Sequence, residues 1–277
     1  MSILVGIDNS AHGRAALEWA SREAALRGVA LNIFHAFPWP LAGVAVSERR
    51  LGLCRAAEHL VAEAVRRAGE LAPEVSAELA SGEASASLIE RSAGAELVVV
   101  GTRGHRRFHG FLAGSVASQV AAHAFCSVVM VGPEPPHGAR EIVVGVGADP
   151  AGPALRAAFA EAALRGVRLR AVHTWRPITA LTPAGMAPIT STVGQLERRE
   201  EHCLIEALAP WRVRYPQVEV EGTVISGNPR HVLVDASPDA ALLVVGAHER
   251  SELLALALGS VTHAAARHAE CPLLIAR

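Results

Sequence analysis

The chain has 277 residues, 51% of them apolar, with a net charge of −1, which allows one large domain or two domains of about 140 residues. The near-neutral charge gives no indication of a general nucleic-acid or membrane partner, and no run of about 18 apolar residues predicts a membrane span. All 26 basic residues are arginine, so the chain lacks the lysine that Walker-type phosphate sites, Schiff-base enzymes and protein kinases require.

The first half alternates apolar strands with helices. We predict a strand over residues 3–7, a helix that ends at Arg27 before Gly28, a strand over 29–37 and a long helix over 47–71. A strand near 75–80, a short helix near 85–93, a strand over 96–101, a helix from Ser115 and a strand over 127–131 complete this half. The continuously apolar run 96–101 is typical of a parallel strand that helices cover on both faces.

The second half repeats the first. AALRGV occurs at 24–29 and 162–167, and SGEASASLIERSAGAELVVVG (81–101) resembles SGNPRHVLVDASPDAALLVVG (226–246). HAFCSVVMV (123–131) resembles HAECPLLIA (268–276), and the offset of 145 residues is the one that separates 81–101 from 226–246. We therefore predict domains at 1–133 and 141–277, joined by a Pro- and Gly-rich linker at 134–140.

Matching elements are expected in that half: strands over 141–146, 217–225 and 241–246, and helices over 192–214 and 229–237. The predicted fold class is α/β, with two tandem doubly wound, Rossmann-like domains. Each domain is expected to be a mainly parallel five-stranded sheet flanked by helices, which binds ligands beyond the carboxyl ends of its strands.

Two segments of equal length stand at that edge, GTRGHRRFHGFLAGS (101–115) and GAHERSELLALALGS (246–260). In the first, Gly101 ends a predicted strand and Ser115 begins a helix. Backbone N–H groups and the positive end of the helix dipole therefore meet where a phosphate could bind, and Ser115 could cap the helix or donate its hydroxyl outward. Taken alone, these residues are also ordinary strand and helix ends, and the shared frame indicates homology between the halves rather than function.

The spacing G-x2-G-x9-G-S, formed by Gly101, Gly104, Gly114 and Ser115, resembles the nucleotide-binding motif of the universal stress protein family. VGIDNS at 5–10 and the last helix and strand of each half resemble that family as well. The resemblance covers nearly the whole chain as a tandem pair. It implies an adenine nucleotide alpha hydrolase-like fold and an ATP site in the first half.

By this resemblance, Asp8 would bind the ribose or the adenine side of ATP, and the backbone around Ala36 would contact adenine. The phosphates would be held by Gly101, Gly104, Gly114, Ser115 and Val116. Mg²⁺ could accompany the triphosphate, and no side chain is assigned as a metal ligand. Arg103 is either a further phosphate contact or a solvated loop residue.

The second half departs from this pattern. Gly147 stands where the first half has Asp8, with Asp149 two residues later, and Glu249 replaces Gly104. A carboxylate about 4 Å from a phosphate charge costs about 4 kcal/mol at an effective dielectric constant of 20, whereas a neutral hydrogen bond contributes about 1 kcal/mol. Gly246, Gly259 and Ser260 keep the frame, but we predict that this half binds ATP poorly or not at all.

Other residues have simpler interpretations. His35 and His173, at matching strand ends, are predicted to be packing residues, with nucleotide contact as the alternative. The four cysteines are expected to be buried structural thiols: Cys54, Cys126, Cys203 and Cys271. Residues 38–46 and 176–190 are predicted to be loops over the nucleotide cleft or partner surfaces. The N-terminal residues show no basic region before an apolar run, so we expect no signal peptide and a cytoplasmic protein.

The leading functional hypothesis is a non-catalytic, ATP-binding regulator of a stress or dormancy response, with one competent site and an unidentified protein partner. One alternative is a slow ATPase or an adenylating enzyme on the same fold, although no general base is identifiable. Another is a scaffold that binds no nucleotide. The tandem pair is expected to act as an intramolecular pseudo-dimer, and a homodimer is a further option.

Overall fold

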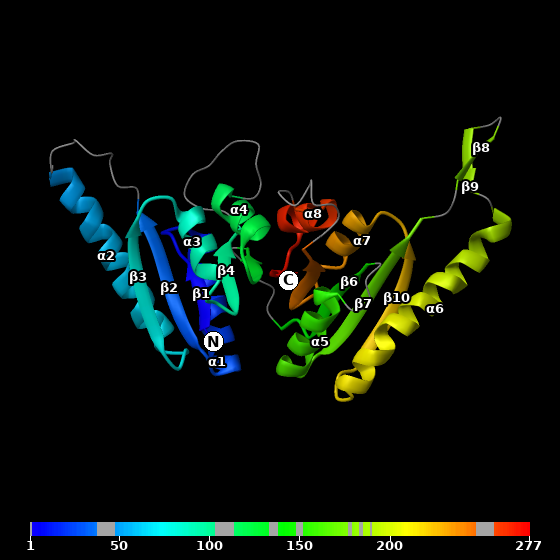
Figure 1. The fold of residues 1–277 in the computed structure, drawn as a ribbon, viewed down its shortest axis with the longest axis horizontal. Coiled ribbons are helices and arrows are strands. Elements are labelled where there is room, and N and C mark those ends of the chain that lie inside the picture. The colour runs from blue at the N-terminus through cyan, green and yellow to red at the C-terminus, as the bar shows by residue number, and fades with distance from the viewer. Residues whose placement is uncertain are drawn as a thin grey trace. The chain divides into compact units, whose positions relative to one another are not determined.

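The structure is a computed structural model that describes residues 2–37, 48–102, 114–132, 138–147, 152–176, 179–182, 185–188, 190–247 and 258–277. For residues 48–53, 179–182, 185–188 and 190–192 only the backbone is described. The chain divides into two compact units, the first built mainly from residues 1–135 and the second from residues 136–248 and 259–276. Figure 1 shows the fold of each unit.

The first unit is a five-stranded parallel sheet in the order β3-β2-β1-β4-β5. Its strands are β1 (Ser2–Gly6), β2 (Ala30–Phe37), β3 (Val75–Ser81), β4 (Leu97–Gly101) and β5 (Ser127–Val131). Its helices are α1 (Ala11–Arg27), α2 (Glu48–Ala68), α3 (Ala84–Ser92) and α4 (Ser115–His123). Helix α1 packs with α2, and α3 packs with α4, so the sheet is covered on both faces.

The second unit repeats this arrangement with the order β10-β7-β6-β11-β12, again parallel throughout. Its strands are β6 (Glu141–Val146), β7 (Arg168–Trp175), β10 (Val220–Ser226), β11 (Leu242–Gly246) and β12 (Leu273–Ala276). Its helices are α5 (Pro153–Arg165), α6 (Thr190–Arg214), α7 (Pro229–Asp235) and α8 (Ser260–His268). The predicted fold class, two tandem doubly wound α/β domains, is confirmed, while the exact linker at 134–140 stays a prediction.

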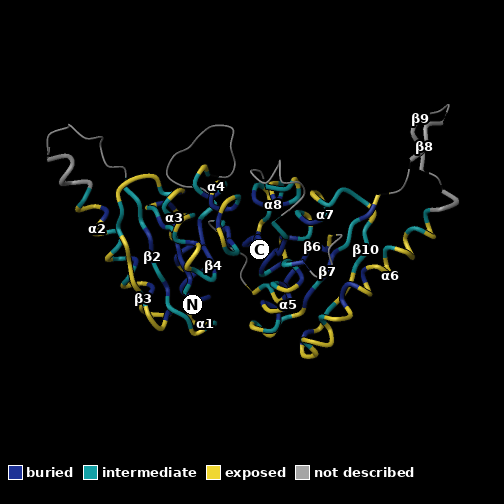
Figure 2. The backbone as a smooth tube through the Cα atoms, in the orientation of Figure 1, coloured by how far each residue is buried: buried dark blue, intermediate teal, exposed yellow. Residues whose placement is uncertain are grey.

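The central strands form the core of each unit, as their continuous apolar character predicted. Leu97–Val100 and Leu242–Val245 are buried along their whole length, and Figure 2 shows β4 largely in the colour of buried residues. Helices on both faces leave neither side of such a strand exposed to water, which is why apolar residues do not alternate with polar ones. Each fully buried valine or leucine side chain contributes about 1.5–3 kcal/mol to stability.

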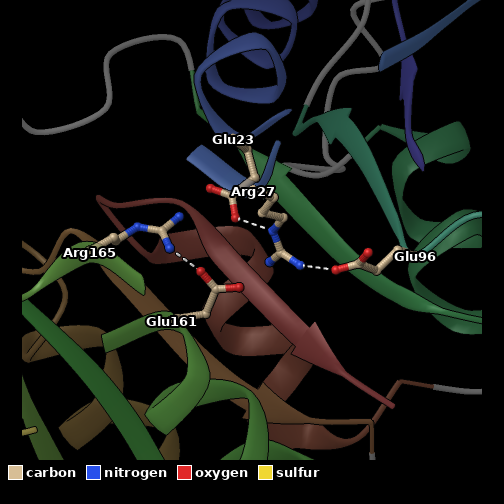
Figure 3. A network of polar contacts seen from close by, with 5 residues as sticks. All are labelled: Glu23, Arg27, Glu96, Glu161 and Arg165. Atoms are coloured by element: carbon tan, nitrogen blue, oxygen red, sulfur yellow. Dashed lines mark hydrogen bonds and ion pairs between the residues drawn. The ribbon is translucent and has the colours of Figure 1, made fainter. Parts of the chain in front are cut away.

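Helices α1 and α5 end in the same way, in accordance with the repeated AALRG sequence. Each is followed by a glycine in the left-handed conformation, Gly28 at φ 67° and Gly166 at φ 62°. In the last turn of α1, Arg27 donates to the buried Glu23 at 2.6 Å and also to Glu96 (Figure 3). Arg165 donates to the buried Glu161 in the corresponding turn of α5, so the repeat preserves an ion pair as well as a helix end.

Residues 176–190 were predicted to be a loop, and the structure corrects this prediction. It contains an antiparallel pair of strands, β8 (Thr179–Thr182) and β9 (Gly185–Pro188). Proline at positions 183 and 188 suggested a loop, but Pro188 ends its strand, where a missing N–H costs little. The corresponding segment of the first half, residues 38–46, lies outside the described residues.

The cysteines agree only in part with the expectation of buried thiols. Cys271 is buried, Cys54 and Cys126 are half-buried, and Cys203 is exposed on α6, so the expectation is wrong for Cys203. Burial raises the pKa of Cys126 to about 11 and that of Cys271 to about 12, because a thiolate loses hydration inside the protein.

In the described parts of the chain, no helix combines the length and hydrophobicity that crossing a bilayer requires.

Candidate functional site

The candidate site lies at the carboxyl edge of the first sheet, where its topology changes direction. The chain adds β2 and β3 on one side of β1 and then crosses to β4 on the other side. Ligands of doubly wound sheets bind at this switch point. Gly6 pairs with Phe34 on one side and with Val100 on the other, so continuing the register brings Asp8 level with Ala36 and with Thr102.

Asp8 is held in place by the turn that leads into α1. Its Oδ1 accepts hydrogen bonds from the backbone N–H of Ser10 at 3.1 Å and from the Ser10 hydroxyl. The same hydroxyl accepts the backbone N–H of Gly13 at 2.9 Å and caps the helix. A Cβ at Gly13 would lie 2.5 Å from Oδ1 of Asp8, so only glycine allows the carboxylate this close to the helix.

Gly101 lies directly against the first turn of α1. A Cβ at this position would come within 2.7 Å of the carbonyl carbon and 2.8 Å of the carbonyl oxygen of His12. Next to it, the Thr102 hydroxyl is 2.9 Å from Nδ1 of His12. Gly101 is therefore required for packing, whatever it contributes to a ligand.

The start of α4 completes this edge. Gly114 is the N-cap residue, and its backbone N–H donates to the carbonyl of Thr102 at 2.8 Å, which links the start of α4 to the end of β4. Ser115 is the first helical residue and is exposed, so its hydroxyl does not cap the helix, one of the two roles predicted for it. Among the described residues, none accepts the N–H groups of Ser115 and Val116, which point out of the helix start.

His35 supports the strand ends at this edge. Its Nδ1 lies 2.8 Å from the carbonyl oxygen of Ile7, so this nitrogen carries the hydrogen and donates it. The contact ties β2 to the residue that precedes Asp8. His173 makes the equivalent contact in the second unit, with Nδ1 at 3.0 Å from the carbonyl oxygen of Val146.

The sequence model of the universal stress protein family matches residues 1–132 and again residues 138–277. The chain belongs to the universal stress protein family. The two matches, taken with the two sheets of identical strand order, make it a tandem member with two universal stress domains.

Curated relatives of this universal stress protein span its full length. Universal stress protein Rv2623 of Mycobacterium tuberculosis is 34% identical, covering 100% of this chain and 96% of its own. Universal stress protein Rv2005c of the same organism is 32% identical, covering 99% of this chain and 96% of its own. The crystal structure of a universal stress protein from Archaeoglobus fulgidus, at 16% identity, covers 100% of this chain and 96% of its own with a TM-score of 0.71, which supports the fold.

The second universal stress domain has a different edge. Gly147 follows β6, and the nearest described atom to a Cβ at Gly246 would be the Cβ of Ala154, at 3.9 Å. The buried Thr262 hydroxyl donates to the carbonyl of Gly246 at 3.2 Å, which links the start of α8 to β11. Gly259 is the N-cap residue of α8 and Ser260 its first residue, so the helix start keeps the geometry of the first domain.

The carboxylate of Glu200, on α6, lies beside His173 at the edge of the second sheet. Nε2 of His173 is 3.0 Å from Oε2 of Glu200, while its Nδ1 faces a carbonyl. Both ring nitrogens of His173 therefore lie within hydrogen-bond distance of oxygen atoms. The runs EHLVAEA (58–64) and EHCLIEA (201–207) align α2 with α6 and put Ala57 at the place of Glu200, so the first domain has no counterpart of this pair.

Several predicted residues lie outside the described part of the chain. Gly104 and Arg103 of the first motif, and Glu249 and Asp149 of the second half, are among them. Asp8, Ala36, Gly101, Gly114, Ser115 and Val116 are described and all lie at the carboxyl edge of the first sheet. Among the described residues, no group of three or more His, Cys, Asp or Glu is arranged to hold a metal ion.

Sequence reasoning did not identify His12, Thr102 or Glu200 as parts of these edges. Thr102 directly follows Gly101, and His12 lies in the first turn of the helix after Asp8, so their positions were available as a signal. The contact between His12 and Thr102 could not be predicted from the sequence, because it joins residues 90 positions apart and depends on how α1 packs over β4.

Proposed function

We propose that this universal stress protein binds ATP at the carboxyl edge of β1, β2 and β4 in its first domain. It acts there as a non-catalytic, nucleotide-dependent regulator of a stress or dormancy response. The observation that carries this proposal is the convergence of Asp8, Gly101 and the start of α4 at the switch point of a parallel sheet. The proposed ligand residues are Asp8, Ala36, Gly101, Gly104, Gly114, Ser115 and Val116.

The chemistry of these groups suits a nucleotide. The carboxylate of Asp8, oriented by Ser10, is an acceptor for ribose hydroxyls. The N–H groups of Ser115 and Val116 and the helix dipole favour an anion, by about 0.3–1 kcal/mol for the dipole. The N–H of Gly114 already donates to Thr102, so Gly114 contributes by leaving room for the phosphate rather than by donating.

Mg²⁺ is proposed as a companion of the triphosphate. It would neutralise phosphate charge and be held mainly by phosphate oxygens and water, since Mg²⁺ keeps several water ligands in nucleotide sites. The described residues offer no cluster of carboxylates or imidazoles for it. Mg²⁺ is therefore expected to bind only together with the nucleotide.

The second domain is proposed not to bind ATP. It has Gly147 at the position of Asp8 and Glu249 at the position of Gly104. The His173–Glu200 pair adds a further carboxylate near the equivalent strand ends. Two acidic groups and a lost ribose acceptor all disfavour a triphosphate, because like charges repel.

Calorimetric titration of the purified full-length protein with MgATP tests this proposal. We expect about one ATP per chain. Two sites of equal affinity would contradict the asymmetric assignment, and the absence of binding would favour the nucleotide-free scaffold. The protein should first be stripped of nucleotide by unfolding and refolding, and the released ligand should be identified by chromatography.

Turnover separates a regulator from an enzyme. Incubation of the protein with MgATP, with ADP and AMP followed over hours, should give no product above a buffer control. Hydrolysis or adenylate formation well above that control, abolished by Gly104→Glu, would replace the regulator with the slow ATPase or adenylating enzyme.

A further inference from the structure

The helix pairs α3–α4 and α7–α8 are built on the same internal contacts. The hydroxyl of Ser92 donates to the carbonyl of Ile89 and accepts the N–H of Phe125 at 2.8 Å. Ser237 makes the same two contacts in the second domain, with Val234 and with Glu270 at 3.0 Å. Ser92 and Ser237 are 145 positions apart, as are their corresponding partners in the two domains. This offset therefore aligns α3–α4 with α7–α8 residue by residue.

The outer surfaces of the two helix pairs differ in charge. In the second domain α7 and α8 line a groove of about 420 Å³, within the size range of small-molecule sites. The ionisable side chains that line it are Arg230, His231, Asp235, His263, Arg267 and His268. At the positions that match four of these basic residues, the first domain has Ser85, Ala86, Ser118 and Ala122, none of them ionisable. Basic side chains are thus not needed to pack this pair of helices.

The two arginines of the groove are not used in ion pairs with the described residues. Nε of Arg267 is buried and has no hydrogen-bond partner among them. Among the described residues, the Arg230 side chain makes one contact, 3.4 Å from its Nε to Oδ1 of Asn228, which also accepts the backbone N–H of Arg230 at 3.2 Å. By contrast, Arg27 and Arg165 are each paired with a buried glutamate, as Figure 3 shows. The positive charges of Arg230 and Arg267 are therefore not paired with a described carboxylate, and a bound anion would pair with them.

We propose that the α7–α8 groove of the second domain is a binding site for a small phosphate-bearing anion. The guanidinium groups of Arg230 and Arg267 bind the phosphate oxygens, since their planar N–H forks match phosphate geometry. His231 and His263 add N–H donors, and the Ser260 hydroxyl lies at the same groove. All of these residues lie in the second domain, and only Ser260 belongs to its Gly-Ser motif. The site is therefore separate from the nucleotide site proposed in the first domain and goes beyond that function.

Calorimetric titration with inorganic pyrophosphate at 150 mM salt tests the proposal on four full-length proteins. They are the parent, Arg230→Ser/Arg267→Ala, the control Arg198→Ser/Arg199→Ala and Gly104→Glu. The groove variant introduces the residues that the first domain has at these positions, so it is designed to fold. The control removes two exposed charges from α6, where they do not line the groove.

We expect saturable binding in the parent, about tenfold or more weaker in the groove variant and unchanged in the α6 control. In Gly104→Glu the groove should still bind pyrophosphate, while binding at the phosphate site proposed in the first domain should be lost. Loss of all pyrophosphate binding in Gly104→Glu would overturn the proposal. Equal affinity in the parent and the groove variant, or no saturable binding in the parent, would overturn the proposal. Citrate binding as tight as pyrophosphate would overturn the preference for phosphate. Circular dichroism establishes that each variant is folded, and Arg267→Gln alone serves as the milder variant, with a smaller loss of affinity expected.

Discussion

The two domains carry the same five-stranded parallel sheet, but the carboxyl ends of their strands are built differently. In the first domain α1 packs so closely that Gly101 has no room for a Cβ, and Asp8 is fixed beside it. In the second domain a Cβ at Gly246 would come no closer than 3.9 Å to a described atom, and Glu200 of α6 pairs with His173. A duplicated fold therefore keeps its strand order while its edge changes, because the core depends on apolar burial and the edge on a few polar contacts.

The largest expected effect comes from exchanging the motif residues between domains. Gly104→Glu should abolish ATP binding in the first domain, since a carboxylate about 4 Å from a phosphate costs about 4 kcal/mol, close to a thousandfold in affinity. Titration calorimetry measures the loss. The reciprocal double variant Gly147→Asp/Glu249→Gly should raise the stoichiometry from one ATP per chain toward two. ATP binding that survives Gly104→Glu would show that the site lies elsewhere.

A smaller effect on stability should distinguish the two matched strand-end glycines. Gly101→Ala places a Cβ within 2.8 Å of the backbone of His12 and should cost about 1–3 kcal/mol. Gly246→Ala meets its nearest described neighbour at 3.9 Å and should change stability by about 0.5 kcal/mol or less. Urea unfolding of both variants measures the difference. Equal destabilisation by the two would mean that the edges are not packed differently.

Removal of the carboxylate from the second edge should have an effect of about 1 kcal/mol. Glu200→Ala introduces the residue of the first domain and deletes a charge-assisted hydrogen bond between side chains that are 17% and 27% exposed. Glu200→Gln keeps an acceptor and should lose less. Urea unfolding again provides the measurement, and a His173→Gln/Glu200→Ala cycle isolates the pair. A coupling energy of zero between the two substitutions would contradict a stabilising role of the His173–Glu200 pair.

The smallest difference is expected at the matched cysteines Cys126 and Cys271. Their pKa values of about 11 and 12 leave about one thiol in a thousand or fewer ionised at pH 8, so both should react slowly with iodoacetamide. The exposed Cys203 should be alkylated first, as peptide mass spectrometry would show. Raising the pH toward 11 should increase labelling of Cys126 before that of Cys271. Equally fast labelling of all three at pH 8 would contradict this pattern.

Much of the fold could be predicted because its signals are local. Arg27-Gly28 marked the end of α1, and apolar runs such as 96–101 marked buried parallel strands. The strands β8 and β9 were missed because proline in this segment suggested a loop. The exposure of Cys203 was missed because it depends on which face of α6 packs against the sheet.

The candidate site was predicted less completely than the fold. The positions of Asp8 and Gly101 at one edge followed from strand order, which the repeat and the α/β pattern had indicated. That Gly114, and not Ser115, caps α4 could not be read from the sequence, since both residues are common at helix starts. The consequence is that Ser115 keeps its hydroxyl exposed at the edge.

The sequence by itself determined the duplication, the order of strands and helices and the membership of the universal stress protein family, because periodicity and motif spacing are properties of neighbouring residues. Only the tertiary structure decided which distant side chains meet. The contact of His12 with Thr102, the pairing of His173 with Glu200 and the basic groove of α7 and α8 each depend on how helices pack on the sheet or on one another. These contacts, rather than the shared strands, give the two domains different chemistry.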